Sequence, residues 1–315
     1  MVSSESERKF KREFSPKHQE NLKNCPLYPE LVSLIRKGEL FPAIREGCMD
    51  FYHCGHRALR RTQNTYISNH CFLHGSRAEG KKSQDVSVQG KDAHLSSILG
   101  RCNGKGKGEG LLLAKTYPFF SFAADSKNKD FPILIDIEAR FAPLDKEKTI
   151  YESDKIDLVF LFPKTRELLF VEGKRRTDSR IRSKAGKPEV VGQVHDYRKQ
   201  LEKRELEILK AYRNASEIMK AVFGFTFPEP TTVLKQVPIL VVGDNNSDKD
   251  LLANDRAHDT WLEDELAETG NDSYRKWDKD GALLLDGRSL FLDPENRMCD
   301  LAAGLNELAD TIRKL

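Results

Sequence analysis

Two apolar segments joined by a short polar turn constrain the fold more than any other feature of the sequence. Residues 155–162 and 167–173 are both rich in apolar side chains, and the turn Pro163-Lys164-Thr165-Arg166 separates them. Apolar runs of this length on either side of a turn predict a β-hairpin. The hairpin fixes the relative position of the charged residues within and just beyond its strands.

Three of these charged residues indicate chemistry. Asp157 lies in the first segment, and Glu172 and Lys174 lie two residues apart in the second, so the latter two share a face of the sheet. Two neighbouring carboxylates repel each other and stay ionised only with a cation between them. Metal-assisted phosphodiester cleavage needs oxygen ligands and positive charge together. The alternative is a solvated strand face with an ordinary salt bridge, although apolar strands rarely carry three such charges.

The surrounding pattern predicts an α/β core. Residues 133–141 alternate as a strand, with Ile133, Ile135, Ile137 and Ala139 on one face and Asp136, Glu138 and Arg140 on the other. A long amphipathic helix is expected over residues 190–223. Residues 237–242 form a further buried strand.

The chain divides into three parts. Residues 1–130 are expected to be an N-terminal accessory region, with a short helix within residues 26–37, for contact with substrate or partner. Residues 131–245 form the core, and residues 246–315 an acidic extension with a strand pair over 281–292 and a closing helix from residue 298. The first residues lack the apolar stretch of a signal peptide, and no segment is long enough to span a membrane. We therefore expect a cytoplasmic protein.

Three short motifs follow one another in the core. They are Ile156-Asp157, then Val171-Glu172-Gly173-Lys174, then Gln193-Val194-His195-Asp196-Tyr197. The series resembles the D…ExK…QxxxY motifs of PD-(D/E)XK nucleases, and its QxxxY element is typical of their RecB-type branch. The resemblance implies a restriction-endonuclease-like core, which is a central mixed sheet flanked by helices.

The resemblance also implies a role for each matched residue. Asp157, Glu172 and the Gly173 carbonyl would bind Mg²⁺ or Mn²⁺, and Lys174 would orient the attacking water or stabilise the transition state. Gln193 and Tyr197, spaced i and i+4, share a helix face that would turn toward the site. For Tyr197 the alternative is simple packing.

The family often adds an earlier acid as a metal ligand. Glu138 on the preceding strand is the first candidate, and Glu152 is the second. A surface ion pair between Glu138 and Arg140 is an equal alternative for the first of them.

A run of basic residues lies directly after Lys174, although the net charge of the chain is only +3. It is expected to hold the nucleic-acid backbone, with a solvated loop as the alternative. Its members are Arg175, Arg176, Arg180, Arg182 and Lys184.

Cysteine and histidine gather between residues 48 and 74. Zinc would need four ligands in tetrahedral array, and the spacing fits no standard zinc finger. Packed side chains in a small N-terminal subdomain are the preferred interpretation, and a structural zinc module is the alternative. The residues are Cys48, His53, Cys54, His56, His70, Cys71 and His74.

These patterns predict a Mg²⁺- or Mn²⁺-dependent deoxyribonuclease in defence, repair or recombination. DNA is favoured because the resembled branch acts mainly on DNA, and nothing in these residues excludes RNA. The sequence carries no ATPase motif, so processive cutting would require a helicase or other motor protein as partner. The alternative is a nuclease fold that no longer cuts and serves in nucleic-acid binding or assembly. Oligomeric state and the choice between ends and internal sites stay open.

Overall fold

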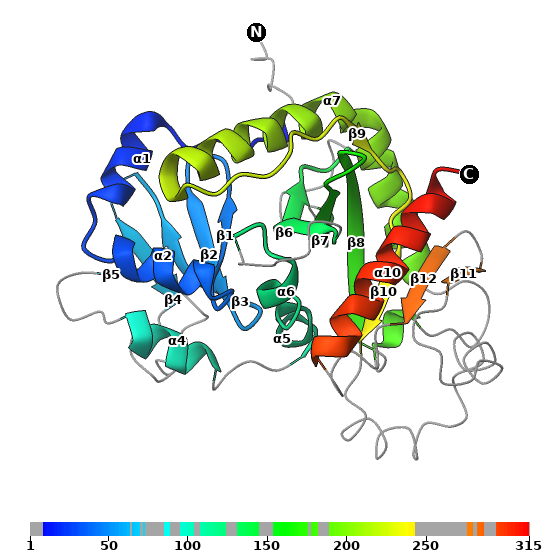
Figure 1. Ribbon diagram of the computed structural model, residues 1–315, viewed down its shortest axis with the longest axis horizontal. Coiled ribbons are helices and arrows are strands. Elements are labelled where there is room, and N and C mark those ends of the chain that lie inside the picture. The colour runs from blue at the N-terminus through cyan, green and yellow to red at the C-terminus, as the bar shows by residue number, and fades with distance from the viewer. Residues whose placement is uncertain are drawn as a thin grey trace, which may run out of the picture.

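Two β-sheets flanked by helices give the protein an α/β architecture (Figure 1). The computed structural model describes residues 9–63, 65–69, 72, 85–88, 95–103, 108–123, 131–144, 154–175, 178–181, 189–242, 276–279, 282–286 and 294–314. No helix in these ranges has both the length and the apolar character needed to cross a bilayer.

The N-terminal sheet is antiparallel, and its five strands follow one another in chain order. Helix α2 (Tyr28–Arg36) confirms the helix expected within residues 26–37. It buries Leu31 and Ile35. The other elements are α1 (Pro16–Lys23), β1 (Phe41–Ile44), β2 (Met49–His53), β3 (His56–Arg61), β4 (Tyr66–Asn69), β5 (Asp85–Val88) and α4 (Leu95–Asn103).

The second sheet is curled and mixed, with the described strands in the order β11-β12-β10-β8-β7-β6 and β9 also paired with β8. Its strands are β6 (Ile133–Phe141), β7 (Asp154–Phe162), β8 (Glu167–Arg175), β9 (Thr232–Val233), β10 (Ile239–Val242), β11 (Lys276–Lys279) and β12 (Ala282–Asp286). The predicted hairpin is confirmed as β7 and β8, and the other two predicted strands as β6 and β10.

The C-terminal strand pair differs from the sequence expectation. It begins at β11, earlier than the predicted range 281–292, and residues 287–293 lie outside the described part of the chain. Because β12 pairs in parallel with β10, the second sheet continues past residue 245. The acidic segment that follows Asp244 also lies outside the described residues.

Helices cover both faces of the second sheet. The predicted long helix is confirmed as α7 (Glu189–Phe223), which is kinked at Arg204 and extends across both sheets in Figure 1. The closing helix is α10 (Pro294–Ile312), whose buried leucines pack with residues of β6, β7 and β8. Short helices α5 (Glu109–Ala114) and α6 (Tyr117–Phe120) lie between the two sheets.

Strand β6 departs from the predicted alternation. Ile135 and Ile137 belong to opposite core clusters, and so do Ile137 and Ala139. The prediction that these residues share one face was therefore wrong. A register shift between Leu134 and Asp136 accounts for the first change of face, and Glu138, at φ 48°, adopts a backbone conformation that is uncommon outside glycine.

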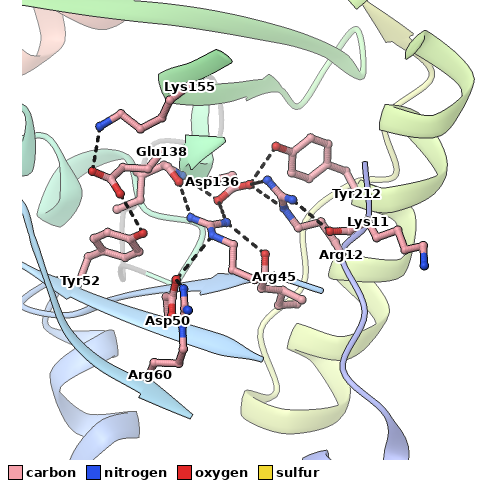
Figure 2. A network of polar contacts seen from close by, with 12 residues as sticks. Lys11, Arg12, Arg45, Asp50, Tyr52, Arg60, Asp136, Glu138, Lys155 and Tyr212 are labelled. Atoms are coloured by element: carbon pink, nitrogen blue, oxygen red, sulfur yellow. Dashed lines mark hydrogen bonds and ion pairs between the residues drawn. The ribbon is translucent and has the colours of Figure 1, made fainter. Parts of the chain in front are cut away.

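The same irregularity buries Asp136, which the alternation placed on the charged face. Its Oδ2 accepts from Arg12 Nε at 2.9 Å and Nη2 at 2.7 Å and from the Tyr212 hydroxyl at 2.9 Å, and its Oδ1 accepts from Arg45 Nη1 at 2.7 Å (Figure 2). Burial raises the pKa of Asp136, but the two guanidiniums outweigh burial and hold it below its ordinary value. One carboxylate thus ties the N-terminal segment, the end of β1, β6 and α7 together.

Removing this charge is expected to destabilise the fold strongly. Asp136→Asn removes the counter-charge of the buried Arg12 and leaves Arg45 only its longer contact with Asp50, and breaking a buried pair typically costs about 3–5 kcal/mol. Urea unfolding of the two proteins measures the difference. Asp196→Asn, which breaks an exposed pair with Lys199, is the matched control and should cost less than about 1 kcal/mol. Equal losses for the two variants would contradict the central role of Asp136.

Candidate active site

The β7–β8 hairpin brings Asp157 and Glu172 together. The Gly173 amide donates to Asp157 Oδ2 at 2.9 Å, and the Glu172 amide donates to the Pro238 carbonyl at 3.0 Å on the side of β10. Both acids are therefore fixed through the backbone of β8. A Cβ at position 173 would lie 2.5 Å from Leu113 Cδ1 of α5, so a larger residue there would displace the Leu113 side chain.

Glu172 and Lys174 form a buried ion pair. They are only 2% and 1% exposed, and Lys174 Nζ contacts Glu172 Oε1 and donates to the Gly173 carbonyl at 3.1 Å. Glu172 Oε1 also accepts from Gln193 Nε2 at 2.9 Å. Glu172 Oε2 is buried too, yet it has no hydrogen-bond partner among the described residues. An orphaned buried carboxylate oxygen is costly unless a ligand uses it.

The first turns of α7 hold the side chain of Glu172 in place. Gln193 and Tyr197 share a helix face, as their spacing predicts, and Gln193 Nε2 contacts the Tyr197 hydroxyl. That hydroxyl donates to the Lys155 carbonyl of β7 at 2.6 Å. Val190, Val194 and Leu201 are buried beside them and hold this face of the helix against the sheet. The structure thus brings all five candidate catalytic residues together.

These residues border one cavity of about 320 Å³ that contains four acids and three cations. The lining residues are Glu109, Asp154, Lys155, Asp157, Glu172, Lys174, Arg180, Gln193 and Tyr197. Burial raises the pKa of Asp157, against the opposing charges of Lys155 and Lys174. Burial and the neighbouring Asp157 raise the pKa of Glu172 to about 8. Both carboxylates would be easier to ionise with a cation between them.

Glu109 is one of two lining acids, with Asp154, that the sequence analysis missed. It begins α5, and its Oε2 accepts from the Arg175 amide at 3.3 Å. Burial, and then the charge of Asp157, raise its pKa. No spacing in the sequence connects Glu109 with the hairpin.

Glu138 lies opposite Asp157 in the β6–β7 ladder, between the pairs Ile137↔Leu158 and Ala139↔Ile156. Its Oε1 pairs with Lys155 Nζ at 3.1 Å, and its Oε2 accepts from the Tyr52 hydroxyl at 3.0 Å. Burial raises the pKa of Glu138, but Lys155, Tyr52 and Arg45 outweigh it and lower the pKa. The structure does not bring Glu138 to the cavity that contains Glu172.

Glu138 borders a second cavity of about 180 Å³, which shares Glu109, Lys155 and Asp157 with the first. Gly55, in the turn between β2 and β3, and Gly110 of α5 also line it. A Cβ on Gly55 would lie 2.1 Å from the Gly110 carbonyl carbon, so no larger residue fits there. The N-terminal sheet therefore supplies part of the wall beside the catalytic candidates.

The basic residues are only partly described. Arg180 borders the first cavity and is held by Asp178 through Nε–Oδ1 and Nη2–Oδ2 contacts of 3.0 and 2.6 Å, whereas Arg175 ends β8 and is half-buried. Four predicted site residues lie outside the described part of the chain, namely Glu152, Arg176, Arg182 and Lys184.

Only some of the cysteine and histidine residues between positions 48 and 74 lie in the described part of the chain. His53 faces the Glu39 carbonyl at 2.6 Å and Asn103 Oδ1 at 2.8 Å, so both ring nitrogens are engaged by oxygen atoms. Within the described ranges, no three His, Cys, Asp or Glu side chains form a group that could hold a metal ion. His70, Cys71 and His74 lie outside these ranges.

Comparison with known proteins adds no relative: no protein-family model matches the sequence, and no match was found among curated proteins or solved structures. The interpretation of the site therefore depends on its own geometry and on the motif series.

The raised pKa of Glu172 gives a pH-dependent stability. Between its ordinary value of 4.5 and about 8, the folded protein keeps this proton and the unfolded chain loses it. Rising pH therefore disfavours the folded state over this window. The test is the melting temperature of the wild type and of Glu172→Gln, both measured in EDTA. We expect the difference, wild type minus variant, to fall between pH 4.5 and 8 and to stay constant above pH 8. A constant difference would contradict this, and Glu202→Gln on the exposed side of α7 is the control.

Proposed function

We propose that this protein is a metal-dependent nuclease with a restriction-endonuclease-like core. The main observation in support is the buried Oε2 of Glu172, which lacks a protein partner and lies in a cavity shared with Asp157 and Lys174. A buried carboxylate oxygen with no donor, beside a second carboxylate, is well suited to a cation. The D…ExK…QxxxY series independently indicates the same chemistry.

The donor set fits Mg²⁺ or Mn²⁺. Both ions prefer carboxylate, carbonyl and water oxygens, which Asp157, Glu172 and the Gly173 carbonyl supply. Mg²⁺ keeps several waters and binds through one or two carboxylates plus substrate phosphate, so a group of three protein side chains is not required. Glu109 borders the same cavity and is a further candidate ligand.

When bound, the metal ion would activate a water molecule and offset the negative charge that develops on the phosphate. The residues of this chain have complementary tasks. Lys174 supplies a fixed positive charge beside Glu172, where it would stabilise charge in the transition state. Gln193 holds Glu172 Oε1, and Tyr197 fixes Gln193 against β7, so the carboxylate keeps one orientation.

DNA is the proposed substrate, in defence, repair or recombination, and a helicase is the expected partner for processive cutting. The cations Arg175 and Arg180, next to the cavity, support contact with a phosphate backbone. The same contacts suit RNA, so both nucleic acids belong in the test.

The direct test is cleavage of linear and circular DNA and of RNA with Mg²⁺, Mn²⁺ or EDTA. We expect metal-dependent cutting that falls by about 100-fold or more in Lys174→Ala and in Glu172→Gln, because each removes charge at the reacting phosphate or its metal. Circular substrates distinguish internal cutting from cutting at ends. Lys220→Ala, an exposed lysine late in α7, is the control.

Cutting that survives both substitutions would overturn the assignment of the site. Binding of nucleic acid with no cutting by the wild type under any metal would instead favour a nuclease fold retained for binding or assembly.

Metal binding alone tests the ligand set. We expect Mn²⁺ binding, followed by calorimetry without nucleic acid, to be lost in Asp157→Ala and weakened about 10- to 100-fold in Glu109→Gln, the range typical of residues that support metal ligands. Glu202→Gln should bind as the wild type does. Unchanged binding in Glu109→Gln would remove that residue from the site.

A further inference from the structure

Lys155 occupies a position that the motif series does not include. It borders both cavities and lies two residues before Asp157 on β7. Its Nζ lies 3.1 Å from Glu138 Oε1 and 4.0 Å from Asp157 Oδ1, and its carbonyl accepts from the Tyr197 hydroxyl. This lysine is thus anchored at both its backbone and its ammonium group.

Among the three cations that line the first cavity, Lys155 is the one that also lines the second. Lys174 is 1% exposed and committed to Glu172 and the Gly173 carbonyl, and Arg180 forms two contacts with Asp178. The side chain of Lys155 is 38% exposed, and among the described residues its ammonium hydrogen-bonds to Glu138 alone. An ammonium has three N–H donors, and the described residues use one of them in a hydrogen bond.

Glu138, which holds the Lys155 ammonium group, has an unfavourable backbone conformation. Glu138 is held at φ 48°, in a region that non-glycine residues seldom adopt and that persists only where the surroundings enforce it. Tyr52, which comes from β2 of the N-terminal sheet, holds Oε2 of this glutamate, and Arg45 lies over the Tyr52 ring (Figure 2). Two sheets therefore cooperate to place one ammonium group.

We propose that Lys155 binds the substrate phosphate next to the scissile one, and that Glu138 and Tyr52 are the positioning residues that hold its ammonium group there. Lys155 Nζ lies 4.0 Å from Asp157 Oδ1, so a phosphate bound by this ammonium group would lie directly beside the scissile one. The inference rests on the proposed function, because the scissile phosphate is located by Asp157 and Glu172. It adds a second backbone contact, and it gives the N-terminal sheet a part in substrate binding.

The decisive measurement is the salt dependence of binding. Labelled DNA oligonucleotides, single-stranded and duplex, are titrated with the intact protein in EDTA at several KCl concentrations. Losing one phosphate contact lowers the slope of log K against log salt by about 0.7 for a single strand and about 0.9 for a duplex. We expect this decrease for Lys155→Ala and none for Lys155→Arg, which keeps the charge. Lys220→Ala should keep the slope of the wild type.

Steady-state cleavage in Mg²⁺ provides a second readout. Lys155→Ala is expected to raise KM about 10-fold with kcat within about threefold of the wild type, because a contact made equally in the ground and transition states changes KM alone. Tyr52→Phe keeps all charges, so it should weaken DNA binding less than Lys155→Ala does and leave the slope unchanged.

The outcomes separate this inference from the proposed function. A wild type that binds and cuts, with an unchanged slope in Lys155→Ala, overturns the phosphate contact and leaves the nuclease proposal standing. A large loss of kcat without a change of slope also overturns it, because Lys155 would then act on Asp157. DNA affinity unaltered in Tyr52→Phe overturns the positioning role, and a wild type that neither binds nor cuts overturns both proposals.

Discussion

The buried carboxylate of Asp136 is the interaction on which the arrangement of the two sheets depends. A charge removed from water must be matched by charges and donors at short range, and here these come from Arg12, Arg45 and Tyr212. The three partners belong to the N-terminal segment, the end of β1 and α7. Satisfying one carboxylate therefore fixes three distant parts of the chain against β6, and β6 in turn pairs with the strand that carries Asp157.

Local sequence patterns predicted the site residues whose positions are set by a single hairpin or a single helix. Glu172 and Lys174 share a face because a strand repeats every two residues, and Gln193 and Tyr197 share one because a helix repeats at i and i+4. The short turn between β7 and β8 leaves little freedom in the position of Asp157. These side chains meet, as predicted, because few other segments influence their geometry.

The remaining features depend on contacts distant in sequence. Glu109 reaches the cavity because α5 packs against β8, and Tyr52 reaches Glu138 because two sheets meet. The faces of β6 could not be predicted, since an inserted residue and a positive φ each break the two-residue repeat. The N-terminal sheet has no clean alternation, and its strands β1 and β2 are buried throughout.

The contact between Gly55 and Gly110 limits how the shape of the second cavity could change. The wall there is made of two backbones in contact, with no room for a side chain on Gly55. Point substitution, the usual route to a new pocket shape, is therefore closed at this wall. The shape of the second cavity can change instead through the side chains that line it, such as Tyr52, Leu113 and Tyr117, or through insertions in the turn after β2.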